Sequence, residues 1–192
     1  MSEPVQLWLE LLKLFGSGVV AASAAQILVW WREARNDRAV LGRDARYLAI
    51  RLAVILEEFA FACASLLDDS KTARRSGGYL GQRSTRLPEL KPYPTDADWK
   101  TLKPSLLDRA LTFINEVHVA AEELNSWPRV AESDDVSDHC EKYAGLLGLR
   151  ALETARDFRR TYKLRGLPTE TLTYDPQPLL QEYRNKALAF TR

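Results

Sequence analysis

LFGSGVVAASAAQILVWW, residues 14–31, is a run of eighteen residues without a charge, and Arg32 follows it directly. A helix that crosses a bilayer needs about 20 mostly apolar residues, with a lower limit of about 17. The stretch ends in Trp30 and Trp31, and amphipathic aromatic rings favour the interface between membrane and water. The sequence therefore predicts one membrane-spanning helix here. The alternative is a helix that is apolar on all sides because it fills a soluble core.

The charges on the two sides of this stretch predict its orientation. Arg32 and Arg35 begin a series of arginines after it, whereas the segment before it holds two acids and one base, Lys13. Because basic flanks stay in the cytoplasm, we expect a single pass with the short N-terminus outside and the C-terminus inside. The small residues at 22–24 resemble a cleavage site, but the acids before them argue against a cleaved leader. The expected location is the inner or plasma membrane, with a soluble cytoplasmic protein as the alternative.

Small residues inside the stretch predict a face for helix association. They repeat at intervals of four, in the series Ser17, Ala21, Ala25 and the series Gly18, Ala22. This spacing lets two helices approach closely in lipid. We therefore expect a protein partner or a second copy of the chain, although small residues also fill weakly hydrophobic anchors.

The remainder of the chain has an ordinary globular composition. Apolar residues make up 46% and charged residues 28% of the 192 residues, which excludes a disordered chain and suits one domain with an appendage. The formal net charge of +1 gives the whole molecule no strong electrostatic preference for any partner. Cys63 and Cys140 are the only cysteines and stand too far apart for a metal-binding spacing. We interpret them as buried thiols.

Helical periodicity and helix-ending residues predict the rest of the fold. Residues 43–69 carry apolar residues at helical spacing, but Arg51, Glu57 and Glu58 disfavour a second membrane span. Further helices are expected from Pro104 to just before Pro128, from Ser133 to about Lys163, and from Asp175 to Phe190. The sequence thus predicts an all-α fold. An N-terminal transmembrane-like helix precedes an antiparallel bundle of three long helices and a short C-terminal helix.

Two domains follow from this pattern. Residues 1–41 are expected to form the membrane anchor and its juxtamembrane segment, and residues 42–192 the cytoplasmic helical domain. Gly42 is the expected break between the first two helices, although the two helices can also be continuous. A loop is expected at 70–95, because three glycines, three prolines and many polar residues disfavour a helix there.

The expected loop is basic, with six bases against one acid. Its candidates for contact with phosphate or lipid headgroups are Arg74, Arg75, Arg83 and Arg86. The bases are spread along the loop without an implied groove, so the sequence does not favour nucleic acid as a partner. The alternative is a solvated loop without a ligand.

Few residues suggest chemistry. The sequence contains no phosphate-binding glycine loop and no hydrolase or metalloprotease motif. His118 and Glu122 lie one helical turn apart, and Glu57 falls on an inward stripe, where a buried carboxylate needs a partner. His118 or an arginine from another helix would supply that partner. Glu57, His118 and Glu122 are therefore the candidates for a metal or ligand site, with a structural polar stripe as the alternative. We predict no catalytic residue and no cofactor.

Three segments carry a resemblance to known sequences: DWKTLKPSLLDRALTFINEVHVAAEEL at 98–124, RYLAIRLAVILEEFA at 46–60 and YDPQPLL at 174–180. They resemble parts of uncharacterised bacterial proteins in which a short N-terminal hydrophobic helix precedes a helical region. Together the segments comprise 49 of the 192 residues. The resemblance implies a bacterial, membrane-anchored helical protein, and it implies no activity and no site residue.

The expected function is that of a membrane-anchored, non-enzymatic interaction or scaffold module. Its helical domain would bind a partner protein, and its small-residue face would set the oligomeric state. One alternative is a membrane-perturbing effector whose anchor helices oligomerise. A second alternative is a soluble helical-bundle protein with a metal or ligand site near Glu57 and His118.

Overall fold

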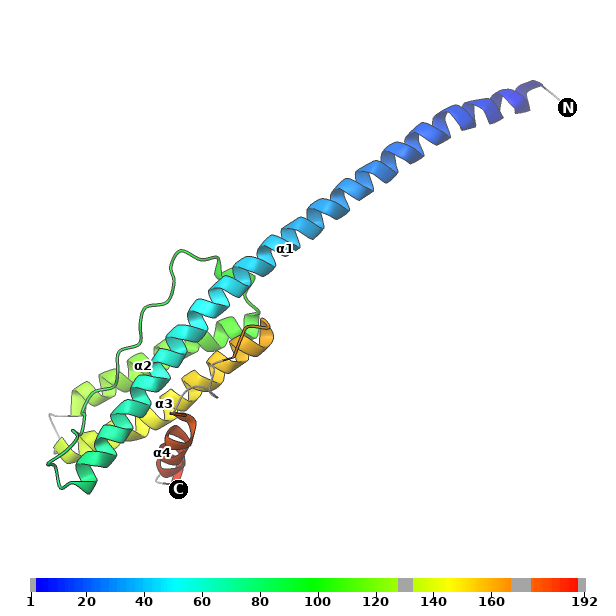
Figure 1. Cartoon of the computed structure of the whole chain (residues 1–192). Helices are drawn as coiled ribbons and strands as arrows, with labels where there is room; N and C mark the ends of the chain where they lie inside the picture. Colours follow the sequence, from blue (N-terminus) through cyan, green and yellow to red (C-terminus); the bar gives the residue numbers. More distant parts are fainter. Residues whose placement is uncertain (1–2, 128–132, 167–173, 190–192) are drawn as a thin grey trace. The chain divides into compact units, whose positions relative to one another are not determined.

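The computed structural model describes residues 3–127, 133–166 and 174–189. Within these ranges it describes the side chain of Trp31 and all side chains from Val40 onward except that of Ser133. The helices are α1 (Glu3–Arg75), the 3-10 helix η1 (Trp99–Thr101), α2 (Pro104–Ser126), α3 (Ser133–Thr161) and α4 (Gln177–Ala189) (Figure 1). No strand occurs in the described ranges, so the predicted all-α class is confirmed.

By their internal contacts the residues form two units, Met1–Arg43 and Asp44–Arg192. Helix α1 is one continuous helix from Glu3 to Arg75, and Gly42, the expected break, lies inside it. Among the residues whose side chains the structure describes, which exclude 14–30, no helix is long and apolar enough to cross a membrane.

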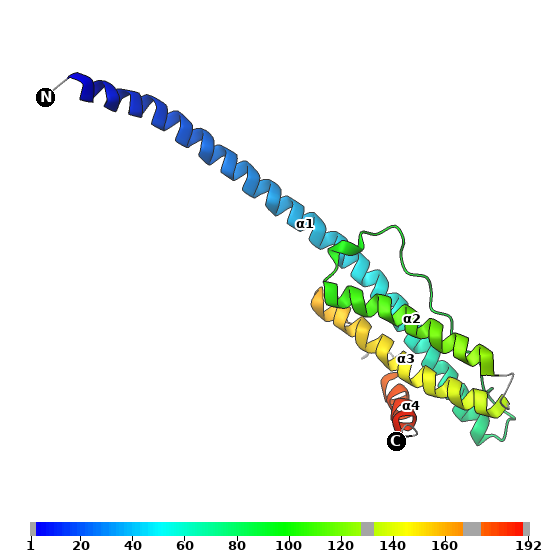
Figure 2. The same cartoon turned by 180° about the vertical axis from the view of Figure 1, so that it is seen from behind.

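In the second unit, which we call the helical unit, helix α3 runs antiparallel to both α1 and α2. Its start contacts the end of α1, where Arg74 pairs with Asp138, and its end returns to the middle of α1. Glu116 of α2 pairs with Arg150 of α3, and the two helices lie side by side in both views (Figures 1 and 2). Consequently α1 and α2 run parallel. The predicted antiparallel arrangement holds for α3 but not for the pair α1 and α2.

The parallel pair is possible because residues 76–103 lead the chain back along the bundle before α2 begins. This crossing segment is fixed to α1 by ion pairs from Lys91 to Glu58 at 2.9 Å and from Arg51 to Asp96 at 2.8 Å. Asp98 caps η1 and accepts a hydrogen bond from the backbone N–H of Lys100 at 3.0 Å. A sequence pattern predicts the length of such a segment but not its direction.

The core lies between α1, α2 and α3 and holds mainly leucine, alanine and phenylalanine side chains. Phe59 of α1 and Phe113 of α2 meet edge to face, with ring centroids 5.6 Å apart. Helix α4 packs against α3, where Gly145 and Gly148 allow close approach. A Cβ on Gly145 would lie 2.6 Å from the Cβ of Tyr183.

Helix α1 extends to Arg75, so the loop expected at 70–95 begins later, at Ser76. Tertiary contacts explain the extra turn. Ser70 and Ala73 are buried, while Lys71 reaches Glu182 of α4 at 3.4 Å. Packing against the neighbouring helices thus stabilises helical structure in a segment whose composition is polar.

Candidate functional site

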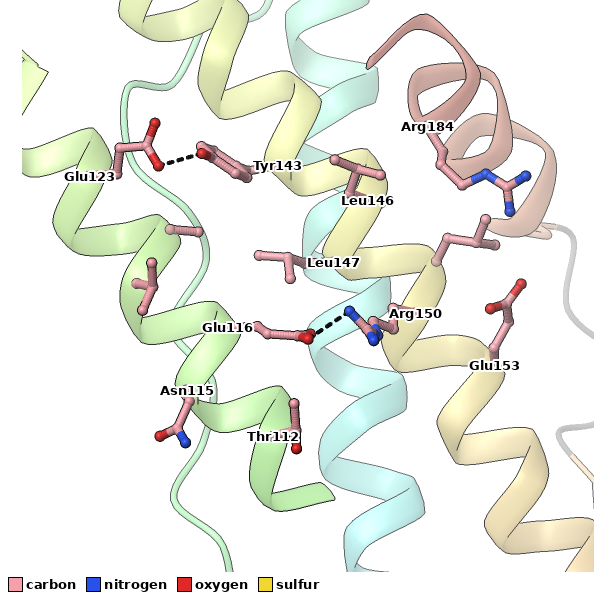
Figure 3. A pocket seen from close by; sticks show the side chains of 13 residues that line it. Thr112, Asn115, Glu116, Glu123, Tyr143, Leu146, Leu147, Arg150, Glu153 and Arg184 are labelled. Carbon is pink, nitrogen blue, oxygen red and sulfur yellow. Dashed lines mark hydrogen bonds and ion pairs between the residues drawn. The ribbon is translucent and has the colours of Figure 1, made fainter. Parts of the chain in front are cut away.

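A groove of about 600 Å³ lies between α2 and α3, and Arg184 of α4 lines it as well (Figure 3). Its apolar lining residues are Val119, Ala120, Leu146, Leu147 and Leu149. Val119 is 63% exposed although it is a large aliphatic residue. Ligand pockets of roughly 300–1,000 Å³ with mostly apolar walls and a few polar groups are typical binding sites. We call this site the α2–α3 groove.

Two polar pairs join α2 to α3 across the groove (Figure 3). Arg150 Nη1 donates to Glu116 Oε1 at 2.6 Å, and Tyr143 Oη donates to Glu123 Oε2 at 2.5 Å. Burial raises the pKa of Tyr143 to about 12, and the adjacent Glu123 carboxylate adds to this effect. The phenol therefore stays protonated and acts as a hydrogen-bond donor at neutral pH.

Two buried polar atoms at the groove have no hydrogen-bond partner among the described residues. They are Oε2 of Glu116 and Nε of Arg184. A buried polar atom without a partner costs stability, roughly 1–3 kcal/mol. Glu116 Oε2 is a hydrogen-bond acceptor and Arg184 Nε is a donor.

Glu57 points inward as predicted, although Ile50 and Val54, the apolar residues on which that prediction rested, are exposed. It is 4% exposed, and Arg159 of α3 binds both of its carboxylate oxygens. The expected arginine partner from another helix is therefore present. Because both carboxylate oxygens face one guanidinium, the pair is an ionic link between α1 and α3.

The other two metal candidates lie elsewhere. His118 and Glu122 are on exposed positions of α2. His118 lines a second groove of about 600 Å³ between α2 and residues 86–93. Within the described residues, no group of three or more His, Cys, Asp and Glu side chains is arranged to hold a metal ion. The structure thus does not bring Glu57, His118 and Glu122 together as a metal site.

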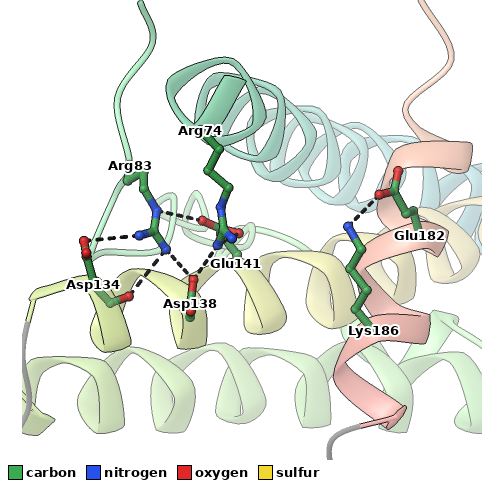
Figure 4. Close-up of polar contacts among 7 residues, drawn as sticks. All are labelled: Arg74, Arg83, Asp134, Asp138, Glu141, Glu182 and Lys186. Atoms are coloured by element: carbon green, nitrogen blue, oxygen red, sulfur yellow. Dashed lines mark hydrogen bonds and ion pairs between the residues drawn. The ribbon is translucent and has the colours of Figure 1, made fainter. Parts of the chain in front are cut away.

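Two of the four basic candidates are engaged in a carboxylate cluster at the start of α3 (Figure 4). Arg74 pairs with Asp138 and lies 2.9 Å from Glu141. Arg83 also pairs with Asp138, and it contacts Glu141 and Asp134, each at 3.2 Å. The Glu141 side chain is only 4% exposed. These arginines fasten the crossing segment and the end of α1 to α3.

The remaining basic candidates, Arg75 and Arg86, are exposed. Arg75 lies at the end of α1 and lines a pocket of about 320 Å³, together with other basic residues and the carboxylates of Asp138 and Glu141. Arg86 lines the second groove beside His118. Contact of these side chains with phosphate or lipid stays a prediction.

Most anchor candidates lie outside the residues whose side chains the structure describes. They are Ser17, Gly18, Ala21, Ala22, Ala25, Trp30, Arg32 and Arg35. Trp31 is the exception, and its side chain is 60% exposed.

Comparison with known proteins gives no relative: no family model, no curated protein and no solved structure matches the chain.

The sequence did not predict the α2–α3 groove, although it contained a signal. Val119 is an exposed aliphatic residue on α2, and it lines the groove. An apolar arc wider than the core requires indicates a surface for another molecule.

Proposed function

We propose that this chain is a membrane-anchored, non-enzymatic interaction module. Residues 14–31 attach it to a membrane, and the helical unit binds a protein partner in the α2–α3 groove. The observation that carries the partner-binding part is the groove itself, which combines exposed Val119, an apolar wall and two polar pairs that cross it. Mostly apolar walls with a few polar groups are the usual composition of a binding site.

The polar groups of the groove favour binding over catalysis. Glu116 and Glu123 are each engaged by a partner on α3, namely Arg150 and Tyr143. A nucleophile paired with an oriented base would support an enzyme, and these pairs instead join two helices. The partner segment that best fits is a helix with an apolar stripe and a polar group, which binds in a groove by its side chains.

The anchor part rests on the uncharged stretch 14–31 and the arginines that follow it. Among the side chains that the structure describes, the first one buried in the core of the helical unit is that of Ala45. An apolar stretch of this length requires an apolar environment, and lipid supplies one. The tryptophans at its end suit the membrane interface.

The anchor is tested by alkaline carbonate extraction of cells that express the full chain. We expect the wild type to stay with the membrane and the double variant Val20→Lys/Ile27→Lys to be released, because central charges disfavour insertion. Val119→Lys, which places the same charge in the groove, is the matched control and should stay with the membrane. Recovery of the wild type in the soluble fraction would reject the anchor. A C-terminal tag protected from protease in intact cells would establish the orientation.

Partner binding is tested separately, with a photo-crosslinking amino acid at position 119 of the full chain in cells. We expect one discrete adduct from position 119 that is absent when the probe replaces Leu188, an exposed residue of α4 outside the groove. An adduct pattern that is the same at both positions, or no adduct at 119, would contradict binding in the groove.

A further inference from the structure

Helix α1 carries an apolar stripe on its outward face in the helical unit. The stripe consists of Tyr47, Ile50 and Val54, which are 61%, 43% and 39% exposed. Their spacings of three and four residues place them on one face of the helix. The fully buried Leu52 is two residues from both Ile50 and Val54, or about 200° around the helix. A helix on the surface of a soluble domain usually has polar residues opposite its core face.

Charged pairs border the stripe on both sides. Arg51 and Glu58 lie about 40–60° from Val54 in one direction, and Glu57 lies about 60° from it in the other. Asp96, Lys91 and Arg159, respectively, neutralise these three side chains. The rim therefore carries exposed paired charges on the side of Arg51 and Glu58, and on the other side the stripe ends at the nearly buried Glu57–Arg159 pair. Exposed apolar patches with a polar border mark interaction sites.

From this arrangement we infer that the stripe Tyr47–Ile50–Val54 packs against the same stripe of a second copy of the chain, with the two α1 helices parallel. The inference deepens the proposed function and rests on its anchor, because two copies anchored in one membrane present α1 in the same direction. The small-residue series in residues 14–31 predicts self-association of the same helix from separate residues.

The charges at the start of the stripe fit this parallel pair. Asp44 and Arg46 are both exposed, and they lie on opposite edges of the stripe, each about 80° from Val54. When two parallel helices are related by a two-fold axis between them, the Asp44 edge of each helix lies next to the Arg46 edge of its partner. Asp44 of each copy then faces Arg46 of the other, so the contact is made twice. Such an isologous contact closes into a dimer.

Cysteine crosslinking of the full chain in membranes tests the inference. The native thiols, Cys63 and Cys140, are buried, and burial raises the pKa of both, so they should not react. We expect Tyr47→Cys and Val54→Cys each to give a disulfide-linked dimer on oxidation. Val119→Cys is the matched control, because Val119 is an exposed aliphatic residue on α2, and it should give no dimer.

The outcomes separate the possible arrangements. An antiparallel pair centred near Val54 would crosslink at position 54 and not at 47, and it would overturn the inference. Absence of dimer at both positions would also overturn it, and carbonate extraction of the same samples would show whether the anchor fails with it. In the Val54→Cys background, Ile50→Asp should lower the dimer yield by about tenfold or more, because it buries a carboxylate without a partner. Ile50→Leu should retain the yield.

Discussion

Arg159 of α3 binds Glu57 of α1 with two hydrogen bonds, from Nε to Oε1 at 2.5 Å and from Nη2 to Oε2 at 2.6 Å. The two side chains are 16% and 6% exposed. The hydrogen bonds to Glu57 raise the pKa of Arg159. Nη1 of the same guanidinium donates to the carbonyl oxygen of Arg165 at 2.6 Å, so one side chain ties α1, α3 and the chain after α3 together.

Removal of the Glu57 charge should therefore destabilise the helical unit. We expect Glu57→Gln to lower the free energy of unfolding by about 3 kcal/mol, because it leaves Arg159 nearly buried without a counter-charge. Denaturant titration of the full chain in detergent measures the change. The neighbouring Glu58→Gln, which breaks the exposed pair with Lys91, should cost less than about 1 kcal/mol.

The double variant Glu57→Leu/Arg159→Met tests whether the stability lost in Glu57→Gln comes from a buried charge that is left without its partner. Replacement of both partners by apolar residues should recover most of the stability that Glu57→Gln loses, because neither charge is then left buried. If Glu57→Gln and Glu58→Gln lost equal stability, the ion pair would not be the link between α1 and α3.

The close approach of α4 to α3 gives a second prediction. A Cβ on Gly145 would lie 2.6 Å from the Tyr183 Cβ and 3.0 Å from the backbone N of Arg184. Because backbone cannot move aside easily, Gly145→Ala should destabilise the docking of α4 by about 1–3 kcal/mol. Hydrogen exchange of the α4 amides should accelerate in this variant.

Gly42→Ala is the control for helix propensity. Gly42 also lies in a helix, and a Cβ there meets nothing within 4 Å. Alanine should stabilise that position by roughly 0.5–1 kcal/mol. Opposite signs at positions 42 and 145 would show that packing outweighs propensity at Gly145, and a gain at both would contradict the close contact.

The carboxylate cluster gives a third prediction. Arg83 connects the crossing segment to Asp134, Asp138 and Glu141 (Figure 4). Arg83→Ala should accelerate hydrogen exchange in residues 76–90 while the core amides of α1 and α3 stay protected, because Glu141 retains Arg74. Arg86→Ala, whose side chain lies outside the cluster, should leave this exchange unchanged. Equal effects of the two variants would contradict the role of Arg83.

The helices of the bundle were predictable because local signals mark their ends. Pro104 opens α2, and Pro128 follows its end at Ser126. The expected helix from Ser133 to about Lys163 agrees with the observed Ser133–Thr161. These ends depend on backbone restrictions that act within a few residues.

The relative direction of the helices and the partner of Glu57 depend on distant residues and could not be predicted in the same way. The sequence limited the partner to His118 or an arginine, and only the packing of α1 on α3 selects Arg159. The apolar residues of α2 show the same limit. Leu107 and Ile114 are only partly buried, whereas Leu106 and Phe113 fill the core. An apolar arc this wide allows two rotations of α2, and the tertiary contacts decide between them.

Tyr143 gives a prediction at alkaline pH. Burial, with a contribution from Glu123, raises its pKa to about 12 from an ordinary value of 10.0. Between these two values the folded state holds the phenol proton more tightly than the unfolded state does. The contribution of Tyr143 to stability is therefore complete below pH 10 and is lost as the pH rises towards 12.

Between pH 10 and 12 the free energy of unfolding should fall less in Tyr143→Phe than in the wild type, because the variant has no phenol at position 143 to ionise. The absorbance of ionised tyrosine, followed as a difference between the two proteins, isolates the one phenol from the other tyrosines. We expect the midpoint of this difference titration near pH 12. A midpoint near 10 would show that the Tyr143 phenol is solvated, and it would contradict the hydrogen bond to Glu123 that joins the two walls of the α2–α3 groove.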